Sequence, residues 1–217
     1  MPRPKATSDA HLLAAAHRVV MRVGPNLTLA DVAKEAGVSA ATLVQRFGSK
    51  RGLLLAFAAS GSPLLAEEFA RIRQRSKSAL AAVYATADCM AAMAQTPQML
   101  ANSLAFLQID LTDPEFQKHA HTHSRGMQAE IKALLDEAVG EGDLVCHDTS
   151  RLARAVQTMM GGSLLQWAID REGKVTDRMR EDLDTLLKPR SAAKAPHGAG
   201  SHRERRRRPR RKVVWHT

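Results

Sequence analysis

The side chains best suited to chemistry in this sequence are small and polar, and they share one face of a short predicted helix. This helix follows Ser39 and runs to about Phe47. Its candidate contact residues are Ala41, Thr42, Gln45 and Arg46. Gln can pair with adenine N6 and N7, and Arg with guanine O6 and N7, so this face can read base edges in a DNA major groove. An ordinary solvated helix face has the same composition, so periodicity alone leaves both interpretations open.

A tight turn positions this helix against a preceding one. The preceding helix starts at a Thr28 cap and carries apolar residues at i, i+3, i+4 and i+7, namely Leu29, Val32, Ala33 and Ala36. Gly37 ends it, and Ser39 is a good N-cap for the second helix. Two helices joined by so short a turn must cross steeply, which predicts a helix-turn-helix unit.

The helical period also predicts which residues of the second helix face inward and which anchor the unit. The predicted inward residues are Ala40, Leu43, Val44 and Phe47. Thr28 and Lys50 bracket the unit at helix N-termini, where backbone N–H groups and an ammonium suit phosphate oxygens. The candidate DNA-binding residues are therefore Thr28, Ser39, Ala41, Thr42, Gln45, Arg46 and Lys50.

This part of the chain resembles the N-terminal domain of the TetR family of bacterial transcriptional regulators. The resemblance rests on residues 28–54, TLADVAKEAGVSAATLVQRFGSKRGLL, with an amphipathic helix before them and a longer helix after them. Ala41 stands where the family often has Gly, and Val44 where it usually has Tyr. If the family's Tyr touches the DNA backbone, phosphate anchoring here must depend more on Thr28, Lys50 and the N-terminal arm.

The net charge of +10 is concentrated at one end of the chain. Residues 191–217 carry nine Lys and Arg against one Glu, so they contribute +8 and residues 1–190 only +2. DNA affinity of the body must then come from a local patch. The candidate cations are Arg3, Lys5, Arg46, Lys50 and Arg51. The basic tail leaves a second hypothesis open, a non-specific nucleic-acid-binding protein dominated by that tail.

Cysteine usage and hydropathy indicate a cytoplasmic protein. The two cysteines, Cys89 and Cys146, do not form a disulfide framework, which favours a reducing compartment. No uninterrupted apolar run approaches the roughly 18–20 residues of a membrane span, and the N-terminus lacks the apolar core of a signal peptide. We expect no membrane partner.

Helical periodicity continues to residue 189, which predicts an all-α protein of about nine helices. The expected organisation is a flexible basic arm (1–9), a three-helix helix-turn-helix domain (10–50), a larger helical effector-binding and dimerisation domain (51–189) and a disordered polybasic tail (190–217). Gly61-Ser62-Pro63 interrupts the fourth helix, which predicts either a kinked connecting helix or a plain loop.

The segment 152–169 is apolar nearly all round and contains Gly161 and Gly162, each of which costs about 1 kcal/mol in a helix interior relative to Ala. Close approach of another helix would compensate. The resemblance implies that the last two body helices pair in a homodimer, here through residues 148–187, which would read an inverted-repeat operator. An ordinary buried core helix is the alternative.

Met90, Met93, Met99, Phe106 and Met127 are candidates for an adaptable apolar pocket that takes a small-molecule effector. A plain hydrophobic core explains the same spacing. Asp88 is either a polar group of that pocket or a solvated residue. His119 and His123 share a helix face, but no Cys or carboxylate completes a metal site with them, so we predict no metal.

No arrangement of residues indicates catalysis. The sequence has no Ser-His-Asp order, paired-carboxylate site or phosphate-cradling Gly loop, so we predict no enzyme, no catalytic residue and no cofactor. The resemblance implies a sequence-specific regulator of transcription that binds double-stranded DNA, a ligand-responsive homodimeric repressor.

Overall fold

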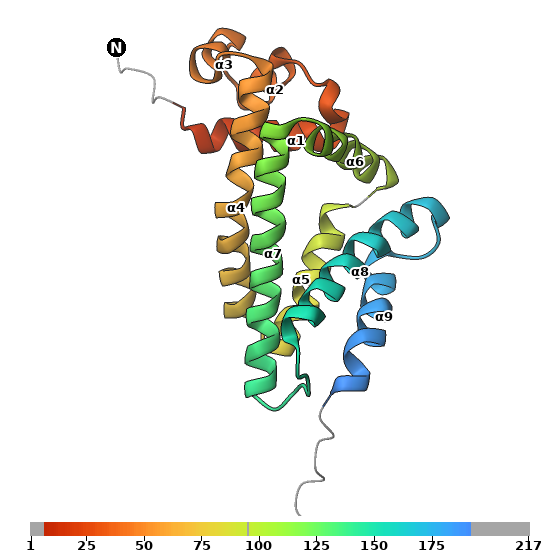
Figure 1. Cartoon of the computed structure of the whole chain (residues 1–217). Helices are drawn as coiled ribbons and strands as arrows, with labels where there is room; N and C mark the ends of the chain where they lie inside the picture. The colour runs from red at the N-terminus through yellow and green to blue at the C-terminus, as the bar shows by residue number, and fades with distance from the viewer. Residues whose placement is uncertain (1–6, 95, 192–217) are drawn as a thin grey trace, which may run out of the picture.

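In the residues that its computed structural model describes, 7–94 and 96–191, the protein consists of helices joined by turns and short loops (Figure 1), which confirms the predicted all-α fold. The nine α-helices of these ranges are α1 (Asp9–Val23), α2 (Leu29–Ala36), α3 (Ala40–Phe47), α4 (Lys50–Arg75), α5 (Ala79–Met93), α6 (Pro97–Thr112), α7 (Pro114–Gly140), α8 (Thr149–Asp170) and α9 (Val175–Leu187). Short 3₁₀ turns follow α1 (Gly24–Asn26) and α9 (Lys188–Arg190). The predictions for Arg3, Lys5 and the tail beyond residue 191 lie outside the described residues.

Local capping sets where most of these helices begin. Eight of the nine described helices start after a residue whose side chain accepts a hydrogen bond from a first-turn N–H. The capping residues are Ser8, Thr28, Ser39, Ser49, Ser78, Thr96, Asp113 and Asp148. A side-chain cap satisfies an N–H that has no partner within the helix, so it fixes the boundary from adjacent residues alone.

The first three helices form a head whose hydrophobic core is shared with the rest of the protein. Its buried cluster contains five residues of α1 and residues of α2 and α3, among them Leu43. The same cluster contains Leu53 of α4, Phe106 of α6 and Phe116 of α7. The head is therefore packed onto the first turns of α4 and α7, which continue into the body, and onto the middle of α6.

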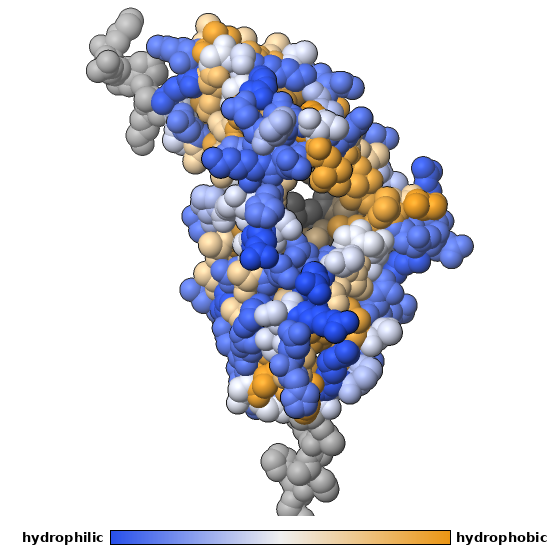
Figure 2. All heavy atoms as spheres, viewed as in Figure 1, coloured by the Kyte–Doolittle hydropathy of each residue, from blue (hydrophilic) through white to orange (hydrophobic). Residues whose placement is uncertain are grey.

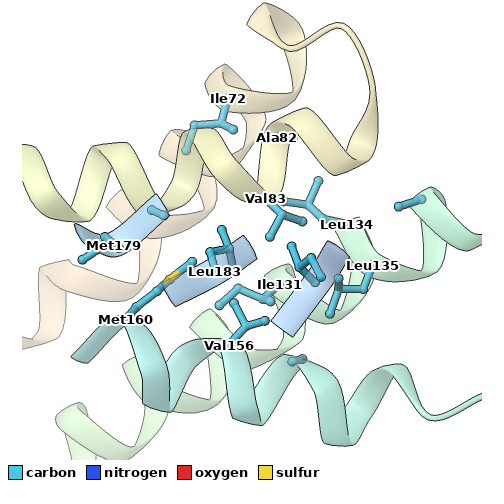
Figure 3. Close-up of a cluster of buried hydrophobic side chains, with 14 of the residues drawn as sticks. Ile72, Ala82, Val83, Ile131, Leu134, Leu135, Val156, Met160, Met179 and Leu183 are labelled. Atoms are coloured by element: carbon cyan, nitrogen blue, oxygen red, sulfur yellow. The ribbon is translucent and has the colours of Figure 1, made fainter. Parts of the chain in front are cut away.

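The body has its own core, where α5, α7, α8 and α9 converge (Figure 3). Helix α7 contributes the buried side chains of Ile131, Leu134 and Leu135, which face Val83 of α5. From the other side α8 and α9 contribute Val156, Met160, Met179 and Leu183. These side chains are fully buried, so this cluster holds the four helices as one packed unit.

Helix α4 joins the two cores without a break. It runs through Pro63, so the plain-loop alternative is wrong. Pro has no N–H, so the carbonyl of Ala59 lacks its usual donor four residues on. By length and composition α4 is also a candidate membrane span. Uninterrupted apolar runs in the sequence did not indicate it, because polar and Gly residues at 60–62 divide its apolar residues. Its buried residues lie near the two ends, in the head core and in the body core.

The start of α4 lies very close to the end of α3, and Gly52 makes this possible. A Cβ at residue 52 would lie 2.0 Å from the carbonyl oxygen of Phe47. Because that oxygen belongs to the backbone, any larger residue would displace the last turn of α3 or the first turn of α4.

We predict that Gly52→Ala destabilises the protein by about 1–3 kcal/mol, as overpacking generally does, and lowers its Tm by roughly 3–10 °C. Gly140→Ala is the matched control, because apart from adjacent atoms of the same helix no atom of the described residues lies within 4 Å of its Cβ position. The control should unfold at or slightly above the wild-type temperature in a thermal melt followed by circular dichroism. Equal Tm values for the two variants would contradict the close contact.

Candidate nucleic-acid interface

Helix α3 lies at one end of the molecule, on the outer side of the head (Figure 1). The turn before it is fixed by Gly37, which adopts the left-handed conformation (φ 69°). Beyond this glycine the N–H of Val38 donates to the carbonyl of Ala33 at 2.9 Å. The predicted helix-turn-helix arrangement of α2 and α3 is therefore present, with α3 as the projecting helix.

The inward face predicted for α3 is only partly right. Leu43 is fully buried and Phe47 is half-buried, but Ala40 and Val44 are exposed, Val44 by 47%. The reason is that α3 packs mainly against α2 and α4, so its buried stripe is narrower than the periodicity suggests. The outward face consists of Ala40, Ala41, Val44 and Gln45.

Two of the predicted polar contacts are used within the helix itself. The hydroxyl of Ser39 accepts from the backbone N–H of Thr42 at 3.2 Å and lies 2.9 Å from the Thr42 hydroxyl. Thr42 is half-buried. Gln45, in contrast, is exposed, and none of the hydrogen bonds of the described residues involves its side chain. Its amide is thus available to a partner.

Arg46 is directed to the start of α1. Its guanidinium donates to the carbonyl of Thr7 at 3.1 Å and pairs with the Asp9 carboxylate at 3.2 Å. Both contacts are exposed, so the side chain can exchange them, but in this structure it braces α3 against α1. The sequence pattern contained no signal for Asp9 as a partner of this arginine.

Thr28 forms a capping box with Asp31. The Thr28 hydroxyl donates to the Asp31 carboxylate at 2.7 Å, and the Thr28 N–H donates to the same carboxylate at 2.8 Å. These side-chain and backbone hydrogen bonds lower the pKa of Asp31. Because the hydroxyl has one hydrogen, a phosphate contact from Thr28 would have to replace its bond to Asp31.

Most cations near the head are paired, and Lys50 is an exception. Arg18 and Arg22 bind Glu35 at 2.6 and 3.2 Å, and their hydrogen bonds lower its pKa. None of the ion pairs of the described residues includes Lys50, the half-buried first residue of α4. Its ammonium is available to phosphates at this end of the protein, as is that of the exposed Lys34 on α2, which those ion pairs also leave out.

Arg51 connects the head to the body. Its guanidinium binds Asp113 at 2.8 Å and Glu115 at 2.5 Å, and it lies 5.6 Å from the ring centroid of Phe116. The sequence placed Arg51 among cations for DNA, whereas the structure ties it to the start of α7. A second contact runs from the Asn102 amide of α6 to the Met21 carbonyl of α1 at 2.9 Å.

The residues predicted for an apolar pocket are divided between the two cores. Met90 and Met127 pack against the body core, and Phe106 belongs to the head core. Met99 is half-buried, and the side chain of Met93 is outside the described part of the structure. Figure 2 shows a hollow bordered by α6, α7 and α8 with hydrophobic residues on part of its rim. Asp88 is an ion-pair partner of Arg180, with Nε to Oδ1 at 2.7 Å.

A different pocket, of about 520 Å³, opens between α7 and the start of α8. It is lined by charged side chains, among them Arg125, Lys132, Arg151 and Arg154, and by none of the five residues predicted for the effector. No group of three metal-binding side chains occurs within 7–94 and 96–191. His123 faces Gly61 of α4, and burial lowers its pKa, so its ring is neutral at pH 7.

Two family models match the chain. Residues 12–57 match the model described as bacterial regulatory proteins, tetR family. Residues 85–189 match the model described as BetI-type transcriptional repressor, C-terminal. No curated protein matches the sequence.

Solved structures share this fold at low sequence identity. A TetR transcription regulator from Haloarcula marismortui has a TM-score of 0.70 at 16% identity, over 84% of this chain and 97% of the other. Reduced Escherichia coli NemR has a TM-score of 0.65 at 14% identity, over 82% and 97%. Bacillus subtilis FadR in complex with stearoyl-CoA has a TM-score of 0.62 at 15% identity, over 83% and 98%.

We predict that Asp110→Asn stabilises the protein above about pH 6. Burial raises the pKa of Asp110 in α6 from 3.8 to about 6, against the opposing charge of His119. The folded state therefore favours the protonated acid, and ionisation between these pH values destabilises it. The carboxyl is half exposed, so solvent screens part of this, and we expect a gain of about 1 kcal/mol, or 2–4 °C in Tm, at pH 7.5.

The same thermal melts at pH 4 supply the control for Asp110→Asn. There the wild-type carboxyl is largely protonated in the folded protein, so the two proteins should unfold at nearly the same temperature. A stability difference that is independent of pH would contradict the raised pKa.

Proposed function

The chain belongs to the TetR family of bacterial transcriptional regulators, and from this premise we propose that it is a ligand-responsive, homodimeric repressor that binds an inverted-repeat operator. The observation that carries the proposal is the projecting position of α3, with Gln45 exposed and the unpaired ammonium of Lys50 nearby. In this proposal the protein acts in the cytoplasm and binds double-stranded DNA. It uses no catalytic residue and no cofactor.

The DNA-binding part of the proposal assigns different roles to the two ends of the helix-turn-helix unit. Gln45 can form a bidentate pair with adenine, which reads sequence. Lys50 and the N-terminus of α2 at Thr28 can bind phosphates, which fix register without reading sequence. Arg46 supports the position of α3 through Asp9, so its effect on binding is indirect.

The proposed dimer forms through α8 and α9, residues 148–187. Gly161 and Gly162 are exposed, and apart from adjacent atoms of α8 itself no atom of the described residues lies within 4 Å of a Cβ placed on either. Leu165 and Ile169 continue the same exposed side of α8. Within the described residues no neighbouring group packs against these glycines to offset their cost in the helix, whereas a second copy packed closely against α8 would do so. A buried core helix would not leave this side exposed.

The proposed effector binds in the body and acts on the head through α6 and α7. The hollow bordered by α6, α7 and α8 supports this place (Figure 2). FadR, a protein of the same fold, was solved with stearoyl-CoA, and we extend from it only a preference for an apolar small molecule. Asn102 and Arg51 connect α6 and α7 to the head, so a shift of these helices reaches α3. By linkage, the effector and the operator weaken each other's binding equally.

Selection from a random duplex pool tests the proposal directly. The full-length protein is incubated with the pool at roughly physiological salt and with excess competitor DNA, which suppresses binding to phosphates alone. Enrichment of an inverted repeat would support a dimeric, sequence-reading regulator. Binding without an enriched sequence would favour the alternative, non-specific binding dominated by the basic tail.

We predict that Gln45→Ala relaxes selection at one base position per half-site, by about 1–3 kcal/mol of discrimination, because a bidentate contact is lost. Arg46→Ala should instead weaken binding at all sequences alike, because it removes the brace between α3 and α1. Gln117→Ala, an exposed glutamine on α7, is the control and should leave the selected sequence unchanged. Loss of one base position in the Arg46 variant would show that arginine reads DNA directly.

We predict that Ile169→Glu converts the dimer to monomers at micromolar concentration, because a carboxylate at the interface costs several kcal/mol. Leu111→Glu on α6 is the matched control, since Leu111 is 67% exposed and Ile169 is 65% exposed. Light scattering during gel filtration gives the mass of each. If the Ile169 variant stayed dimeric and the Leu111 variant became monomeric, the prediction would be wrong and the interface would lie on α6.

A further inference from the structure

The outward face of α3 is mostly apolar, although it lies where polar contacts were expected. Ala40, Ala41, Val44 and Gln45 are all exposed and fall within about 140° around the helix axis. Only Gln45 among them has a polar side chain. The other polar side chains of this region make contacts within the protein. Ser39 and Thr42 are hydrogen-bonded to each other, and Arg46 is paired with Asp9.

Val44 is the largest apolar group on this face. Its side chain is 47% exposed and belongs to neither buried cluster. Single exposed apolar residues are ordinary on protein surfaces. Here, however, Val44 lies between two alanines and beside Gln45, and the small alanines let the backbone of α3 come close to a partner surface.

A DNA major groove offers one apolar group at its base edges, the C5 methyl of thymine. We propose that α3 recognises thymine through this methyl group, with Val44 making the main contact, Ala40 and Ala41 allowing the close approach, and Gln45 pairing with a neighbouring adenine. This inference rests on the proposed DNA-binding function and names the base chemistry that the site reads. Each half-site of the operator then contains a thymine opposite Val44.

Deoxyuridine tests the inference, because it pairs like thymidine and keeps O4 but lacks the methyl group. The duplex enriched from the random pool is resynthesised with one thymidine replaced in each half-site, and its affinity for the full-length protein is measured position by position. Burial of one methyl group corresponds to about a fourfold effect on affinity. We expect a loss of about fourfold per half-site at one position, roughly 15-fold for the symmetric pair, and little change at flanking thymidines.

Variants of the protein assign that loss to Val44. Val44→Ala should bind the thymidine and deoxyuridine duplexes with nearly equal affinity, and Val44→Thr, which keeps the shape, should prefer thymidine less than the wild type does. Val145→Ala is the matched control, an exposed valine (59%) outside the head, and should keep the full preference. The affinities of wild type and Val44→Ala for the two duplexes form a double-mutant cycle. Its coupling free energy reports the contact between Val44 and the methyl group, because an effect of the methyl group on DNA flexibility alone would be the same for both proteins.

Two results would overturn the inference, and they differ in what else they affect. If an inverted repeat is enriched but no deoxyuridine position lowers affinity, or if Val44→Ala keeps the preference for thymidine, methyl recognition by Val44 is wrong while the regulator function stands. If the pool yields no enriched sequence, α3 reads no base, and the proposed function fails together with this inference.

Discussion

The position of α3 depends on a hydrophobic core that three helices of the head cannot complete by themselves. Leu53 of α4, Phe106 of α6 and Phe116 of α7 supply part of that core. The head therefore cannot tilt independently of the body without exposing apolar surface that is now buried. Contacts at its edge strengthen the same connection, since Arg51 binds the start of α7 and Asn102 binds the end of α1.

Most of the positive charges on the head are held in ion pairs, so its net charge overstates the number of cations that are open to a partner. Arg18, Arg22 and Arg46 are each bound to a carboxylate of α1 or α2. These exposed pairs orient helices, and such pairs contribute little stability individually. Among the described residues of the head, the ammonium groups of Lys34 and Lys50, the amide of Gln45 and a small apolar face remain for a nucleic-acid partner. This surface therefore offers a partner shape and apolar contacts as well as hydrogen bonds.

Helix α8 of the body has one packed side and one exposed side. The inner side of α8 is packed into the body core, while its outer side carries two glycines and two large apolar residues that the protomer leaves uncovered. A symmetric pair formed there would hold two copies of α3 in a fixed relation. Because α6 packs against both α1 and α8, a displacement of α6 would reach the head and the body together.

The sequence by itself determined the helices and most of their limits, because caps such as Thr28, Ser39 and Asp113 act on adjacent N–H groups. The helix-turn-helix unit could also be predicted from neighbouring residues, because it requires only Gly37 and two short apolar stripes. Only the tertiary structure decided how α3 is rotated, leaving Val44 exposed, that Arg46 binds Asp9, and that Phe106 completes the core of the head. Each of these outcomes depends on a partner distant in the sequence, and periodicity carries no information about which partner will cover a given side of a helix.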